Sequence, residues 1–114
     1  MLGSEENIKT LAQIQKALEA IDSDRLVPEL SDSERALLEE SALALRQAER
    51  VLIEKTQKDL LKQLEGVTLR LSNISKLIRE KVKSINNIAK SLDGIEAVVK
   101  HIALVGGFAA KLKK

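Results

Sequence analysis

The sequence predicts an all-α protein, either an up-down helical bundle of three to four helices or an elongated antiparallel coiled-coil assembly. The 114 residues, which we expect to form a single domain, include five Gly and one Pro, so few residues interrupt helix. One Phe is the only aromatic residue, so a core must consist of Leu, Ile, Val and Ala. Apolar residues also recur at spacings of three and four along most of the chain, which is the period of an amphipathic helix.

The first helix is expected over residues 5–22. Ser4 stands in the position of a helix cap, and Glu5 and Glu6 follow in the first turn, where carboxylates suit the positive end of the helix dipole. One apolar stripe predicts the buried face of this helix: Ile8, Leu11, Ile14, Leu18 and Ile21.

A linker is expected over residues 23–31, because Pro28 disfavours helix at the residue before it. Its apolar residues are expected to hold it against the bundle: Leu26, Val27 and Leu30. The second helix is expected over 32–64, because Ser31 and Glu34 have the spacing of a capping box.

A heptad stripe fills the C-terminal part of the chain, where helices are expected over 67–92 and 94–112. Its apolar positions are seven apart, in two sets offset by three residues, with Lys81 as the one exception. The sets are Leu64, Leu71, Ile78, Ile85, Leu92 and Val99, and Val67, Ile74, Ile88, Ile95 and Ile102. The residues flanking the stripe are mostly small or apolar, which favours a helix with two neighbours in a bundle.

Two glycines leave the path of the chain open. A turn near Gly66 would join the second and third helices antiparallel, whereas a continuous helix from 32 to 92 would be a rod about 90 Å long. Asp93 and Glu96 have capping-box spacing, so a new helix is able to begin at Gly94.

Charge divides the chain into an acidic and a basic part. Residues 1–66 hold 14 acidic and 9 basic side chains, and residues 67–114 hold 3 acidic and 10 basic ones. Packing of the acidic part on the basic part, within or between chains, explains this asymmetry most simply. A basic arm for nucleic acid or anionic lipid is the other interpretation.

Catalytic groups are scarce. The absence of Cys excludes disulfides, thiolate metal sites and cysteine nucleophiles. His101 is the only histidine and is expected to face solvent, and Glu39 and Glu40 are expected to be exposed helix charges. No phosphate-binding loop or nucleophile motif is present. We therefore expect a protein that is not an enzyme, with no metal, no cofactor and no evident small-molecule substrate.

A basic ridge is expected on the outward face of the C-terminal helices, formed by Lys76, Arg79, Lys83 and Lys90. Nucleic-acid binding is not expected there, because single-strand binding uses aromatic stacking platforms and the one aromatic residue lies elsewhere.

The C-terminal segment 94–114 is apolar and then basic. Residues 94–105 continue the heptad stripe and are expected in the core, and the end of the chain is expected to contact a protein partner or a membrane surface. The contact residues would be Phe108, Lys111, Leu112, Lys113 and Lys114. The longest uncharged apolar run, 102–110, is too short to cross a bilayer, which takes about 20 residues. No secretion signal is visible, so a cytoplasmic location is expected.

These features predict a non-enzymatic helical interaction or assembly protein. It would form homo-oligomers or bind a protein partner through its aliphatic heptad faces. The alternative is a membrane-surface-active protein that uses the basic amphipathic C-terminal helix, 94–114.

Overall fold

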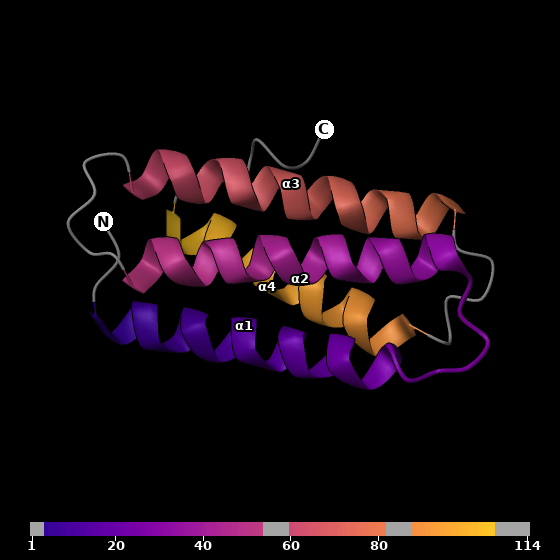
Figure 1. The fold of residues 1–114 in the computed structure, drawn as a ribbon. Coiled ribbons are helices and arrows are strands. Elements are labelled where there is room, and N and C mark those ends of the chain that lie inside the picture. The colour runs from indigo at the N-terminus through magenta and orange to yellow at the C-terminus, as the bar shows by residue number, and fades with distance from the viewer. Residues whose placement is uncertain (1–3, 54–59, 82–87, 107–114) are drawn as a thin grey trace.

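An up-down bundle of α-helices makes up this computed structural model, which describes residues 4–53, 60–81 and 88–106 (Figure 1). Its helices are α1 (Ser4–Asp24), α2 (Asp32–Ile53), α3 (Leu60–Lys81) and α4 (Ala89–Gly106). Both α1 and α3 pack against α2 and α4, so each helix has two neighbours and α2 lies diagonally across the bundle from α4. The described residues contain no strand, and the predicted all-α bundle is confirmed.

The chain folds back on itself and does not form the long rod. Its longest dimension is 42 Å, and its radius of gyration of 13.9 Å is close to the value of about 13 Å for a compact chain of this length. The reversal between α2 and α3 lies between Ile53 and Leu60, so the turn expected near Gly66 is wrong and Gly66 lies inside α3. Residues 54–59 are all polar, so a helix continued through them would gain no apolar burial.

Gly94 also lies inside a helix. The structure begins α4 at Ala89, so the expected helix start at Gly94 is wrong. Packing explains this glycine: a Cβ atom added there would lie 2.9 Å from the Cα atom of Ala17 on α1. The helices α1 and α4 therefore approach so closely at this point that only glycine fits without a backbone shift.

The predicted capping box at the start of α2 is confirmed. The Ser31 backbone N–H donates to Glu34 Oε1 at 3.1 Å, and the Glu34 N–H donates to Ser31 Oγ at 3.2 Å. In the linker, Leu30 is buried and Val27 packs against the core, as predicted. Leu26 is 81% exposed, so its predicted contact with the bundle is wrong.

The core is aliphatic and belongs to one chain. Each helix contributes fully buried side chains, among them Ile14, Ile21, Leu38, Leu45, Leu52, Leu64, Leu71, Ile78, Ile88, Ile95 and Ile102. The heptad stripe is thus confirmed as a buried face at these positions. Ile8 is 67% exposed, so the stripe predicted for α1 does not extend into the core at its first position.

Small hydroxyl residues fill the flanks of the stripe where two helices meet. Thr68 Oγ1 donates to the Leu64 carbonyl at 2.6 Å, and Ser75 Oγ donates to the Ser72 carbonyl at 2.8 Å. Because the Thr68 and Ser75 hydroxyls are both satisfied within their own helix, these two positions let neighbouring helices pack without leaving a polar group unpaired.

Candidate interaction surfaces

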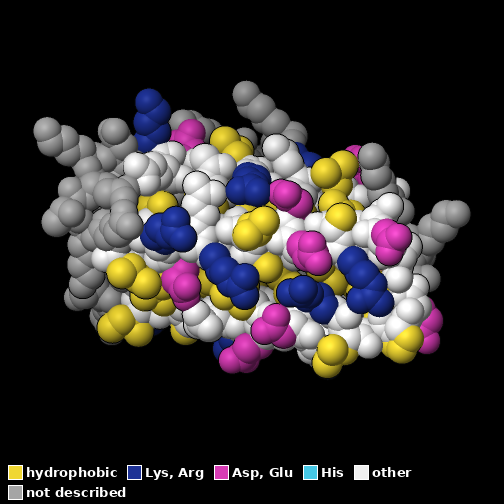
Figure 2. All heavy atoms as spheres, in the orientation of Figure 1, with side chains coloured by type: hydrophobic (Ala, Val, Ile, Leu, Met, Phe, Trp, Pro, Cys, Tyr) yellow, Lys and Arg dark blue, Asp and Glu magenta, His cyan; other side chains and the backbone are white. Residues whose placement is uncertain are grey.

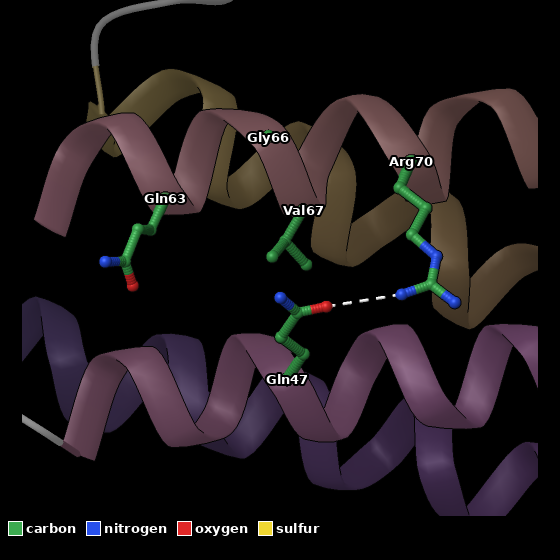
Figure 3. A pocket seen from close by; sticks show the side chains of 5 residues that line it. All are labelled: Gln47, Gln63, Gly66, Val67 and Arg70. Atoms are coloured by element: carbon green, nitrogen blue, oxygen red, sulfur yellow. Dashed lines mark hydrogen bonds between the residues drawn. The ribbon is translucent and has the colours of Figure 1, made fainter. Parts of the chain in front are cut away.

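An open groove of about 450 Å³ lies between α2 and α3 (Figure 3). It is lined by Gln47 of α2 and by Gln63, Gly66, Val67 and Arg70 of α3. Gly66 helps to keep the groove open, since a Cβ atom added there would meet no heavy atom within 4 Å. The position of Gly66 is therefore open, whereas α1 closes the position of Gly94.

The groove offers hydrogen-bonding groups. One Arg70 N–H donates to Gln47 Oε1 at 3.2 Å (Figure 3). Another donates to Glu40 Oε2 at 2.8 Å, so the guanidinium contacts two side chains of α2. Val67 provides an apolar floor. The five lining residues include no nucleophile and no side chain that acts as a base at pH 7. These side chains therefore suit binding better than acid–base chemistry.

A second hollow, of about 340 Å³, lies on the outer side of α2 and is lined by Arg46, Glu49, Arg50 and Ile53. Glu49 accepts a hydrogen bond from the Gln15 side chain of α1. Within the described residues, Arg46 and Arg50 have no hydrogen-bond or ion-pair partner. Figure 2 shows the face of the bundle seen in Figure 1, where basic, acidic and apolar side chains alternate.

The most deeply buried carboxylate in the described residues is that of Asp24, the last residue of α1. Its Oδ2 accepts the Ser91 backbone N–H at 2.9 Å and the Ser91 hydroxyl at 2.7 Å. Ser91 lies in the first turn of α4, so the carboxylate of one helix caps the N-terminus of another. Sequence reasoning missed this contact, because the two residues are 67 positions apart. The role is structural, since both groups are buried.

The predicted basic ridge is distributed over two helices. Lys76 and Arg79 are exposed on α3, Lys90 is exposed on α4, and Lys83 lies outside the described residues. The Arg79 guanidinium makes two hydrogen bonds with Glu96 of α4, at 2.8 and 2.6 Å. These bonds and the charge of Glu96 raise the pKa of Arg79 above its ordinary value, so this residue is a permanent cation with its counter-ion in place.

His101 differs from its predicted environment. It is half-buried on α4 rather than fully solvated, and its Nε2 atom is buried without a hydrogen-bond partner in the described part of the chain. Glu39 and Glu40 are exposed, as expected, and lie near Arg25 and Arg70.

The predicted C-terminal contact residues, Phe108 to Lys114, lie outside the described residues. The part of α4 that precedes them turns its apolar side chains inward, with Ile95, Val98 and Ile102 fully buried.

Within residues 4–53, 60–81 and 88–106 no group of three His, Asp or Glu side chains is arranged to hold a metal ion. Among the same residues, no helix is long and apolar enough for a membrane span.

Large aliphatic side chains remain outside the core. Those more than half exposed are Ile8, Leu26, Leu43, Ile53 and Leu104. Ile8, Ile53 and Leu104 come from three different helices but lie toward the same end of the bundle, where α1 begins and α2 and α4 end (Figure 1).

Comparison with known protein families, with characterised proteins and with solved structures gives no match.

Proposed function

We propose that this chain is a non-enzymatic helical interaction protein that assembles with further copies of itself. The observation that carries the proposal is the set of large aliphatic side chains that the completed core leaves exposed, from Leu26 at 81% to Leu43 at 56%. Exposed apolar side chains that lie at one place on a protein surface are typical of contact sites, and Ile8, Ile53 and Leu104 lie toward the same end of the bundle. The accessible hollows hold hydrogen-bonding groups and Arg side chains, which suit recognition.

The surface used for assembly differs from the one first expected. The heptad positions from Leu64 to Ile102 that the structure describes lie within one chain, nearly all of them buried, so a partner reaches them only if the helices separate. Assembly is therefore proposed through the exposed aliphatic side chains.

Membrane-surface binding through residues 94–114 has weaker support. Ile95, Val98 and Ile102 pack inside the bundle, so lipid contact would fall to residues 107–114, which lie outside the described residues.

Light scattering over a dilution series tests the proposal. We expect the molar mass to rise from 12.6 kDa toward a multiple of that value as concentration increases. A mass of 12.6 kDa at every concentration would contradict self-assembly. Flotation with vesicles that contain anionic lipid provides the second arm, because binding to them by a strictly monomeric chain would favour the membrane function instead.

A further inference from the structure

The outward face of α2 carries a regular stripe of exposed residues. Its members are spaced alternately four and three apart, opposite the buried side chains of Leu38, Leu45 and Leu52. The stripe, called here the α2 outer stripe, consists of Asp32, Ala36, Glu39, Leu43, Arg46, Arg50 and Ile53. Such spacing places all seven residues on one face of the helix, and this face is left uncovered by the neighbours α1 and α3.

The order of charges along the stripe is self-complementary. Acidic residues occupy its N-terminal part, basic residues its C-terminal part, and Leu43 lies near the middle. A second copy of this helix is repelled if it runs parallel, because like charges then face each other. It is attracted if it runs antiparallel, because acidic residues then face basic ones. Arg46 and Arg50 are one turn apart, and each lacks a partner among the described residues, whereas the other described arginines contact a carboxylate or a backbone carbonyl.

We propose that two copies of this chain pair through the α2 outer stripe. The two helices run antiparallel, and the two-fold axis lies between them at the level of residues 44 and 45. This inference rests on the proposed function and names its surface and its partner. The axis places Glu39 opposite Arg50 of the second copy, and Leu43 opposite the aliphatic stem of Arg46. It also places the small side chain of Ala36 opposite the exposed side chain of Ile53.

The local structure leaves room for this pairing. The hollow lined by Arg46, Glu49, Arg50 and Ile53 lies where Ala36 and Glu39 of the second copy enter, and the Glu49 carboxylate there already accepts a hydrogen bond from Gln15. Glu39 approaches Arg25 at 3.8 Å, and its side chain is 60% exposed, so the carboxylate remains accessible. The two copies of α2 overlap over residues 36–53, a contact about 26 Å long, which gives a small interface and a weak, reversible dimer.

Charge exchange between positions 39 and 50 tests the pairing by light scattering. Arg50→Glu places two carboxylates opposite each other twice in the dimer, and we expect dissociation to become at least about tenfold more favourable. The double variant Glu39→Arg with Arg50→Glu exchanges the charges, and we expect it to regain most of the lost affinity. Lys100→Glu on α4 changes the net charge equally, lies away from the stripe, and should leave the affinity unchanged. Circular dichroism confirms that each variant is folded.

Distances between the copies provide an independent measurement. The chain has no Cys, so Gln47→Cys and Ser33→Cys each give one labelling site on α2. At 1.5 Å per residue, the proposed axis separates the two copies of position 47 by about 8 Å along the helix and those of position 33 by about 35 Å. A dimer whose affinity is the same in all the charge variants, or in which positions 33 and 47 both give short distances, would overturn this pairing and leave the proposed self-assembly intact. A chain that is monomeric throughout would overturn both.

Discussion

Two glycines within helices respond oppositely to the same substitution, and this contrast tests the packing directly. Glycine inside a helix is less favourable than alanine by about 1 kcal/mol. At Gly66 an added Cβ atom meets nothing within 4 Å, so Gly66→Ala should stabilise the bundle by roughly 0.5–1 kcal/mol. At Gly94 the same atom would lie 2.9 Å from Ala17 Cα and 3.1 Å from Ala17 Cβ.

The close contact at Gly94 decides the sign of the change. The nearest atom there belongs to the backbone of α1, so relief requires the two helices to move apart. Overpacking of this kind costs about 1–3 kcal/mol, which exceeds the gain in helix propensity. We therefore expect Gly94→Ala to lower the free energy of unfolding by about 1 kcal/mol, a fall of roughly 4 °C in Tm for a domain of this size.

Urea denaturation measures both variants. Circular dichroism follows the transition, because the chain has no Trp or Tyr to report it by fluorescence. Protein concentration is held constant, since self-association would itself change the apparent stability. Gly66→Ala is the matched control for Gly94→Ala. Stabilisation by Gly94→Ala would refute the close approach of α1 and α4, and a clear loss of stability in Gly66→Ala would refute the open space described at Gly66.

The remaining predictions concern the helix cap and the core. Asp24→Ala removes the acceptor for two buried hydrogen bonds from Ser91 and should cost about 2 kcal/mol, whereas Ser91→Ala keeps the backbone donor and should cost about 1 kcal/mol. Equal small losses in urea denaturation would argue against the cap. Leu71→Ala should cost about 3 kcal/mol because Leu71 is fully buried, while Leu104→Ala should change stability by less than about 0.5 kcal/mol. Similar losses for both would show that one of them is misplaced relative to the core.

Local sequence patterns predicted the features that depend on neighbours along the chain. The capping box of Ser31 and Glu34 formed as predicted, since its two hydrogen bonds join residues three apart. The heptad stripe predicted buried positions such as Leu71 and Ile95, because helical periodicity alone determines which residues share a face.

The same patterns were wrong where a helix boundary depended on packing. The heptad register continues through Gly66 and Gly94, and periodicity does not distinguish a helix from two helices that keep the same phase. The turn was expected near Gly66 because it would join the acidic and basic helices antiparallel, and the continuing register gave no signal for the reversal between Ile53 and Leu60. Ile8 was placed on the buried face of the first helix by its spacing, and Leu26 was expected to hold the linker against the bundle, although both side chains are largely exposed.

The sequence by itself determined that the protein is helical, that its core is aliphatic and which face of each helix is buried, because these follow from composition and period. Only the tertiary structure decided that a carboxylate of α1 caps α4, that Ala17 requires a glycine at position 94, and that Arg46 and Arg50 find no partner among the residues that the structure describes. Those features depend on distances between residues far apart in the chain, and such distances are fixed only when the helices pack.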